Sequence, residues 1–301
     1  MRKRAEWRAA LSAMAAVSGV GLASGRELSL FFAQMKGAAW LSVLTACALF
    51  GGMTACIVGE GDRAAQRGAL ALVRDALRLM LCAMASAFML ARLGALGALT
   101  LPLRHGYLFG AGLGLSVALA LRWSHGIELL GLIAILGLST FYSANALDGR
   151  TARVNMTGAT EFSLSGSCPA ALILAALYAS LTACAAAWAL RQVRRDTVRP
   201  MAVGLRCAFL MACALVPGCA ALLRGGDLVL IQPMPWVVLS ARWGIAGFWV
   251  CAGLMALCAT ATLSAAMGVL IDGFRGRRRG LALYMAAAGL ALFCMLAWGQ
   301  I

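Results

Sequence analysis

The sequence has little acid and little charge of any kind. Only 11 of its 301 residues are Asp or Glu, against 26 Lys or Arg, and charged residues make up 12% of the chain. Soluble domains carry about 25% charged residues, so an ordinary soluble fold is excluded. There are only two histidines, and no Cys-x-x-Cys pair, nucleotide-binding glycine loop or His-Glu-x-x-His segment occurs. We therefore expect no enzyme activity, no metal and no cofactor.

Apolar residues dominate instead, at 62% of the chain with a mean hydropathy of +0.87. A bilayer-spanning α-helix needs about 20 mostly apolar residues. The alternation of apolar and polar residues that is typical of membrane β-barrels is absent. The sequence thus predicts an all-α integral membrane protein with about nine (nine to ten) transmembrane helices. We place nine of them at residues 8–34, 38–58, 71–92, 105–121, 126–147, 168–190, 201–223, 237–271 and 281–299. The first and eighth are long enough that each should be tilted, broken or projecting.

The basic residues predict the orientation of these helices. With the N-terminus in the cytoplasm, the inner segments hold 18 Lys or Arg and the outer segments seven, an excess typical of a cytoplasmic N-terminus in the cell membrane. The C-terminus then lies outside. Topology also explains the net charge of +15, so we expect the lipid bilayer and a small solute as partners and no nucleic acid. We treat 1–301 as a single membrane domain, with an outer loop at 148–167 between the halves 1–147 and 168–301.

The first predicted helix contains an unusual segment. Three glycines and two serines lie within residues 18–25, and Arg26 and Glu27 follow at once, near the predicted midplane. A charge at that depth costs at least about 2.5–3.5 kcal/mol, so it needs a polar cavity or a partner. The glycines alone favour close helix packing. The adjacent charges favour a helix broken around a solute site, where backbone N–H groups bind an anionic group of the solute.

The same segment resembles a known family. Residues 19–28, Gly-Val-Gly-Leu-Ala-Ser-Gly-Arg-Glu-Leu, with Phe31-Phe32, are similar to the opening motif of the YkvI-like membrane proteins, a largely uncharacterised family. That family is similar to transporters of the amino acid–polyamine–organocation superfamily, whose LeuT-like fold has two inverted five-helix repeats. The similarity continues at Leu177-Tyr178, at Pro235-Trp236, and at Thr260 and Gly268.

The resemblance implies a broken first helix and particular site residues. The implied substrate-binding residues are Gly21, Ala23, Ser24, Gly25, Glu27 and Tyr178. The implied ion-binding residues are Gly19, Val20, Thr260 and Ser264, the last one helical turn from Thr260. The sequence departs from the family pattern at Ala261, where a second threonine is expected, at Thr182, where an asparagine is expected, and in the missing tenth helix.

These features predict a secondary transporter, or permease, of a small polar solute, possibly an amino acid, driven by Na⁺ or H⁺. Glu27 is the acid that we place near the midplane, and we hypothesise that it transports the coupling proton. The alternative is a non-transporting membrane subunit or receptor that retains the transporter fold. Tyr142 and Tyr178 are expected to be packing or interface aromatics. The aromatic set Trp236, Trp243, Phe248 and Trp249 is expected to include interface anchors rather than to form a stacking platform.

Overall fold

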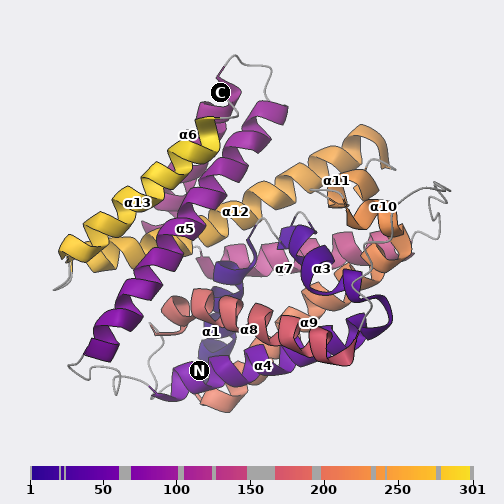
Figure 1. The fold of residues 1–301 in the computed structure, drawn as a ribbon, viewed down its shortest axis with the longest axis horizontal. Helices are drawn as coiled ribbons and strands as arrows, with labels where there is room; N and C mark the ends of the chain where they lie inside the picture. Colours follow the sequence, from indigo (N-terminus) through magenta and orange to yellow (C-terminus); the bar gives the residue numbers. More distant parts are fainter. Residues whose placement is uncertain are drawn as a thin grey trace.

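The computed structural model describes residues 2–19, 22–23, 25–60, 69–100, 105–123, 127–147, 167–191, 198–231, 235–240, 243–275 and 279–298. All regular elements within these residues are helices, so the all-α prediction is confirmed there (Figure 1). In chain order they are α1 (Arg2–Val17), α3 (Arg26–Phe31), the 3-10 helix η1 (Ala33–Ala38), α4 (Ala39–Glu60), α5 (Ala69–Thr100), α6 (Gly106–Trp123), α7 (Ile127–Leu147), α8 (Cys168–Arg191), α9 (Pro200–Gly225), α10 (Asp227–Leu230), α11 (Pro235–Ser240), α12 (Gly244–Arg275) and α13 (Arg279–Trp298).

Seven of the described helical segments are long and apolar enough to cross a membrane, which makes the chain a multi-pass helical membrane protein. They are Ala33–Gly59, Asp75–Thr100, Glu128–Leu147, Cys168–Ala187, Pro200–Gly225, Gly244–Asp272 and Arg279–Leu296. The apolar part of α6, Gly106–Ala120, is shorter. The first predicted helix does not count among the seven because it is interrupted.

The surface of these helices is apolar, which suits a lipid environment. Large side chains such as Leu44, Leu283 and Met295 are 61%, 65% and 76% exposed. Water would oppose this exposure, whereas lipid tails do not. The interior, in contrast, is rich in alanine, and small residues let helix backbones approach closely. Helix α4 approaches α9 closely at Gly51, where a Cβ would lie 2.9 Å from the carbonyl oxygen of Gly204.

The helices pack in two groups. The first group contains α1, α4, α8 and α9, and the second contains α5, α6, α12 and α13 (Figure 1). Helix α7 packs on α1 and α9 of the first group and also contacts α12 of the second. Further contacts between the groups run mainly through α12, which packs on α1 and α8.

Three predicted helices differ in extent from those observed. The segment 8–34 divides into α1 and α3, with η1 following. The segment 237–271 divides into α11 and α12, so the length that suggested tilt or breakage reflects a break. Helix α5 continues to Thr100, eight residues past the predicted end at 92, because the sequence stays apolar beyond Arg92. The predicted outer loop lies outside the described residues except for Ser167.

Candidate functional site

The helix break follows directly from the glycine-rich sequence. Helix α1 ends at Val17, Leu22 and Ala23 are again helical, and α3 begins at Arg26 after the turn at Gly25. Gly25 precedes α3 with φ of 81°, a left-handed conformation that glycine adopts without a steric penalty. A Cβ on Gly25 would also lie 2.6 Å from Nε1 of Trp236. Two independent constraints, backbone conformation and close packing, therefore require glycine at position 25.

Two aromatic residues from distant parts of the chain cover the break. The Tyr142 hydroxyl donates a 2.5 Å hydrogen bond to the carbonyl of Leu22, which lies between α1 and α3. The Tyr142 ring stacks on Trp236, with centroids 4.2 Å apart and planes inclined by 20°. Both aromatic side chains are fully buried, so Trp236 is not one of the interface anchors expected in its aromatic set. The Leu22 carbonyl thus has two donors, Tyr142 of α7 and the backbone N–H of Gly25.

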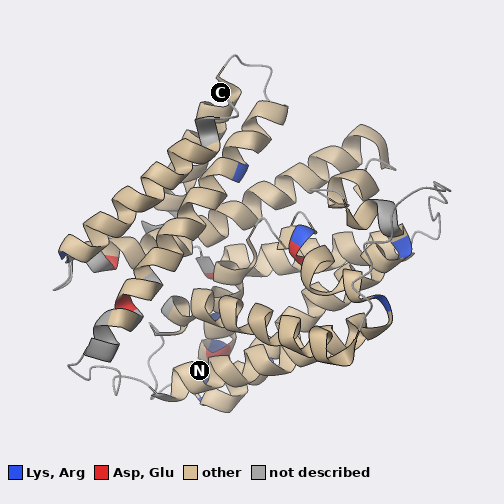
Figure 2. Cartoon of the chain, in the orientation of Figure 1, with Lys and Arg blue, Asp and Glu red and all other residues tan. Residues whose placement is uncertain are grey.

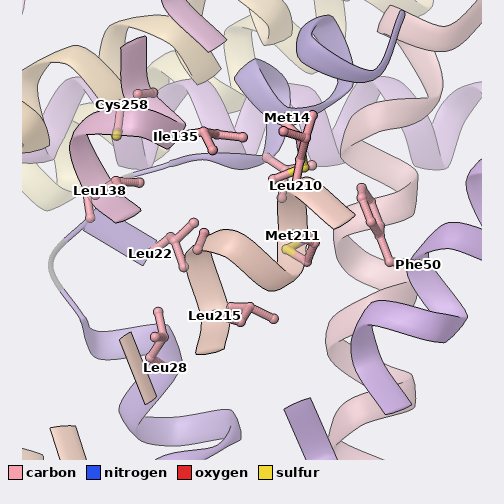
Figure 3. Close-up of a cluster of buried hydrophobic side chains, with 14 of the residues drawn as sticks. Met14, Leu22, Leu28, Phe50, Ile135, Leu138, Leu210, Met211, Leu215 and Cys258 are labelled. Atoms are coloured by element: carbon pink, nitrogen blue, oxygen red, sulfur yellow. The ribbon is translucent and has the colours of Figure 1, made fainter. Parts of the chain in front are cut away.

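Apolar contacts on both sides of Gly25 hold the broken segment in the core. Leu22 precedes Gly25 and Leu28 follows it, and both side chains are fully buried. They lie in one apolar cluster with Leu138 of α7 and with Met211 and Leu215 of α9 (Figure 3). The break is thus packed as firmly as the surrounding helices.

The segment before α12 closes over α3. The Ser29 hydroxyl donates a 2.6 Å hydrogen bond to the carbonyl of Leu230, and Nη1 of Arg26 reaches the carbonyl of Ile231 at 3.5 Å. Because Arg26 extends toward Ile231, its guanidinium points to the segment before α12 rather than to the neighbouring Glu27. Figure 2 shows basic and acidic colouring on α3 in the middle of the fold, while most other coloured charges lie near helix ends.

Glu27 and Tyr178 form the first of two polar clusters, which we call the Glu27 cluster together with Phe31 and Phe32. Glu27 is half-buried among protein atoms and keeps some accessible surface. Within the described residues its carboxylate has no hydrogen bond or ion pair. The buried Tyr178 hydroxyl interacts electrostatically with Glu27 and likewise lacks a hydrogen-bond partner there. The rings of Phe31 and Phe32 lie 5.3 Å and 5.0 Å from the Tyr178 ring.

The second cluster, the Thr262 cluster, consists of Ala15, Ser18, Gly19 and Thr262. The hydroxyls of Ser18 and Thr262 both donate to the carbonyl of Ala15, at 3.2 Å and 3.3 Å. A Cβ on Gly19 would lie 3.5 Å from Oγ1 of Thr262. The family resemblance pointed to Thr260, but Thr262 is the threonine that faces α1. In the sequence, the two threonines are two positions apart and therefore about 200° apart around the helix. This spacing was the available sign that only one of them faces α1.

The other predicted site residues have different surroundings. Thr260 donates to the carbonyls of Ala256 and Leu257 in its own helix, both at 2.9 Å. Ser264 is fully buried, and its hydroxyl has no hydrogen-bond partner among the described residues. Ala23 is buried beside the break. Val20, Gly21 and Ser24 lie outside the described residues. Helix α3 packs on α8, α9 and α10, whereas Thr260 belongs to α12, so the break separates the predicted site residues into two places.

A cavity of about 810 Å³ lies between the two helix groups. Its walls come from Ala16 at the end of α1, from α4 and α8 of the first group, and from α5 and α12 of the second. Thr262 belongs to the lining, so the cavity reaches the Thr262 cluster. The size lies within the usual range of small-molecule pockets, roughly 300–1,000 Å³.

Ion pairs fasten the start of α1 to neighbouring helices. Glu6 is buried and accepts hydrogen bonds from the guanidinium of Arg206 and from the backbone N–H of Arg199, the latter at 3.3 Å. Burial alone would raise the pKa of Glu6, but these hydrogen bonds and the nearby positive charges outweigh it and lower the pKa. Arg8 donates a 2.5 Å hydrogen bond to Glu128 of α7. The first half of the broken helix is therefore tied to α7 and α9.

Comparisons of the chain with protein-family models, with curated proteins and with solved structures found no match.

Proposed function

We propose that this protein is a secondary transporter, or permease, of a small polar solute in the cell membrane, with amino acids as the first class to test. The observation that carries the proposal is Glu27. Its carboxylate has no hydrogen bond or ion pair within the described residues, although it lies beside a helix break and is enclosed by protein. An ionisable group placed at such cost inside a membrane protein is usually functional.

The arrangement of the helices supports a LeuT-like inverted repeat. If α1 with α3 counts as the first span and α11 with α12 as the eighth, the described helices form nine spans. Three of the four pairs of spans five apart then pack against each other: α1 with α8, α4 with α9, and α5 with α12. Contacts between corresponding spans are expected when two inverted repeats interlock.

The position of the cavity supports a state open to the cytoplasm. Most of the lining residues belong to the last halves of α4, α8 and α12 and to the first half of α5. With a cytoplasmic N-terminus, each of these halves lies on the cytoplasmic side. The opposite side of the break is covered by Trp236 and by the hydrogen bonds from α3 to residues 230 and 231. Alternating access requires this combination of one open and one closed side.

Recognition of the solute centres on the Glu27 cluster. A carboxylate and an unpaired hydroxyl suit an ammonium group, and the neighbouring aromatic rings favour a cation further. Helix α3 has only six residues, and Glu27 lies in its first turn, where its charge opposes the binding of an anion. We therefore assign the ammonium group of an amino acid, rather than its carboxylate, to this cluster. Protonation of Glu27 supplies the coupling, and the Thr262 cluster is the candidate place for a coupling cation.

The test is uptake of labelled amino acids into proteoliposomes that hold the purified protein, under an imposed pH gradient or an Na⁺ gradient. We expect accumulation driven by one gradient, and we expect Glu27→Gln to abolish its dependence on pH. Asp272→Asn, which changes an exposed acid at the end of α12, serves as the matched control. Unchanged pH dependence in Glu27→Gln would remove proton coupling, and no uptake under either gradient would remove the transporter proposal.

The alternative function is a membrane subunit or receptor that keeps the fold without transport. One observation favours it: Thr260 donates to its own helix instead of facing the break. Thermal stability of the purified protein, measured with an amino-acid panel, with and without Na⁺ and at several pH values, separates the two. A solute-dependent rise in unfolding temperature supports transport, and no shift with any solute supports the subunit.

A further inference from the structure

The cavity between the helix groups has a lining unlike that of a polar-solute site. Its wall residues are mostly Ala, Leu, Met, Ile and Cys, and none of them is charged. The hydroxyls in the lining already have partners: Ser180 donates to the carbonyl of Ala176 at 2.7 Å, and Thr262 donates to that of Ala15. This lining can form part of a passage for a polar solute but offers it few hydrogen bonds and so no binding site, whereas an apolar molecule gains by leaving water.

We propose that this cavity is a binding site for an apolar ligand body, supplied either by a lipid acyl chain or by a small uncharged molecule. The ligand lies between α4 and α8 on one side and α5 and α12 on the other. It therefore holds the two helix groups apart and stabilises the open arrangement. The site is separate from the Glu27 cluster and does not depend on the proposed transport function, since a membrane subunit with this fold would bind the same ligand.

Cysteines of the native chain can report whether the cavity is occupied. Cys56 of α4 and Cys184 of α8 are free thiols in the cavity lining, and both are exposed. Cys168 lies on the same helix as Cys184, and Cys294 lies on α13; both are free and exposed but do not line the cavity. A ligand in the cavity should shield the first pair and leave the second pair reactive.

The experiment follows N-ethylmaleimide labelling of each cysteine by peptide mass spectrometry, with the full chain in lipid nanodiscs. The soluble probe is 1-adamantanol, an uncharged apolar molecule, and glucose is the polar comparison. At about ten times its Kd, adamantanol should slow labelling of Cys56 and Cys184 about tenfold, because the unoccupied fraction falls to about one in eleven. Labelling of Cys168 and Cys294 should not change, and glucose should have no effect. Equal slowing at all four cysteines, or none at Cys56 and Cys184, would overturn the proposal.

A second arm distinguishes the two sources of the ligand. Nanodiscs are prepared with a phospholipid that carries a diazirine near the end of one acyl chain, and crosslinks are mapped after illumination. An acyl chain in the cavity predicts crosslinks at inward-facing lining residues such as Ala183 and Ala265, which adamantanol displaces. Protection by adamantanol without such crosslinks assigns the site to a small molecule instead.

A cavity-filling variant tests the location. Ala183→Phe fills the space from α8 and should abolish protection by adamantanol, whereas Ile173→Phe on the exposed side of the same helix should retain it. Full protection in a folded Ala183→Phe protein would overturn the assignment to this cavity. If that variant does not fold, the contrast between Cys184 and Cys168 in the unmodified chain still decides the question.

Discussion

The hydroxyl of Tyr142 donates a 2.5 Å hydrogen bond to the carbonyl of Leu22, a residue 120 positions earlier in the chain. This carbonyl belongs to the segment between α1 and α3, where it also accepts a 3.1 Å hydrogen bond from the backbone N–H of Gly25. In a membrane interior no bulk water is available to bond such a carbonyl. The phenol from α7 thus adds a second donor to a backbone group at the break.

Tyr142→Phe should lower stability. Phenylalanine keeps the stack on Trp236 but removes one of the two hydrogen bonds to the Leu22 carbonyl, and such a bond contributes about 0.5–1.5 kcal/mol. The unfolding temperature of the purified protein in detergent measures the effect. Tyr284→Phe is the control because Tyr284 is 69% exposed on α13. Equal unfolding temperatures for the two variants would show that the hydrogen bond contributes nothing.

Gly25→Ala should disturb the break itself. A left-handed backbone conformation costs a non-glycine residue roughly 1–2 kcal/mol. The new methyl group would also meet the indole of Trp236, so the loss in unfolding free energy should exceed that figure. Gly112→Ala on α6 is the control, because no atom lies within 4 Å of its Cβ position and its φ is not positive. We expect Gly112→Ala to be neutral or stabilising by about 0.5–1 kcal/mol. If Gly25→Ala changes the unfolding free energy no more than Gly112→Ala does, both constraints on Gly25 are contradicted.

The crossing of α4 and α9 should respond to a single added carbon. In Gly51→Ala the new Cβ would lie 2.8 Å from the Cβ of Ala208 and 2.9 Å from the carbonyl oxygen of Gly204. Overpacking of this kind costs about 1–3 kcal/mol, so the unfolding temperature should fall. The adjacent Gly52→Ala is the control because nothing lies within 4 Å of its Cβ position. A fall of the same size in both variants would indicate a general effect of glycine replacement in α4.

The ion pair at the start of α1 predicts a dependence of stability on pH. The folded-state pKa of Glu6 is lowered below its ordinary value of 4.5, so folding binds fewer protons than unfolding at this residue. Its contribution is therefore fully present above about pH 4.5 and is lost as pH falls through the lower, folded-state pKa. Glu6→Gln should reduce stability at pH 7 and flatten the loss between pH 5 and the acid limit.

The measurement is the unfolding temperature between about pH 3 and pH 7 for the unmodified chain and Glu6→Gln. Glu128→Gln is the comparison, because the Arg8–Glu128 pair is more exposed and solvent screens it. A pH profile in Glu6→Gln that parallels that of the unmodified chain would show that Glu6 does not contribute to acid lability.

Much of the helix break could be predicted from the sequence, because its causes are local. Gly25 adopts a left-handed conformation, and the glycines and serines before it are poor helix formers in any context. The charge at Glu27 marked the same segment by its energetic cost in a membrane. The residues that contact the break could not be predicted. Tyr142 and Trp236 lie far along the chain, and no local pattern distinguishes a buried stacked pair from interface aromatics.

The orientation of the threonine hydroxyl groups on α12 shows a second limit of prediction from the sequence. Thr260 and Thr262 are two residues apart, so the sequence predicts that they point to different sides of the helix. Which of them meets α1 depends on the rotation of α12, and that rotation is set by packing against α1 and α5. The result is that Thr262, and not Thr260, lies beside Gly19. The apolar cavity is likewise invisible in the sequence because alanine, leucine and cysteine line it as they line any helix interface.

By itself, the sequence determined that this chain forms a set of apolar helices and that the first of them is interrupted before Arg26. Helix length, apolar content and glycine-rich segments act within a few turns, so neighbouring residues suffice to specify them. Only the tertiary structure decided that Glu27 lies beside Tyr178, that Tyr142 satisfies Leu22, and that a cavity separates the two helix groups. These relationships depend on how distant helices rotate and pack, and packing is a property of the whole fold.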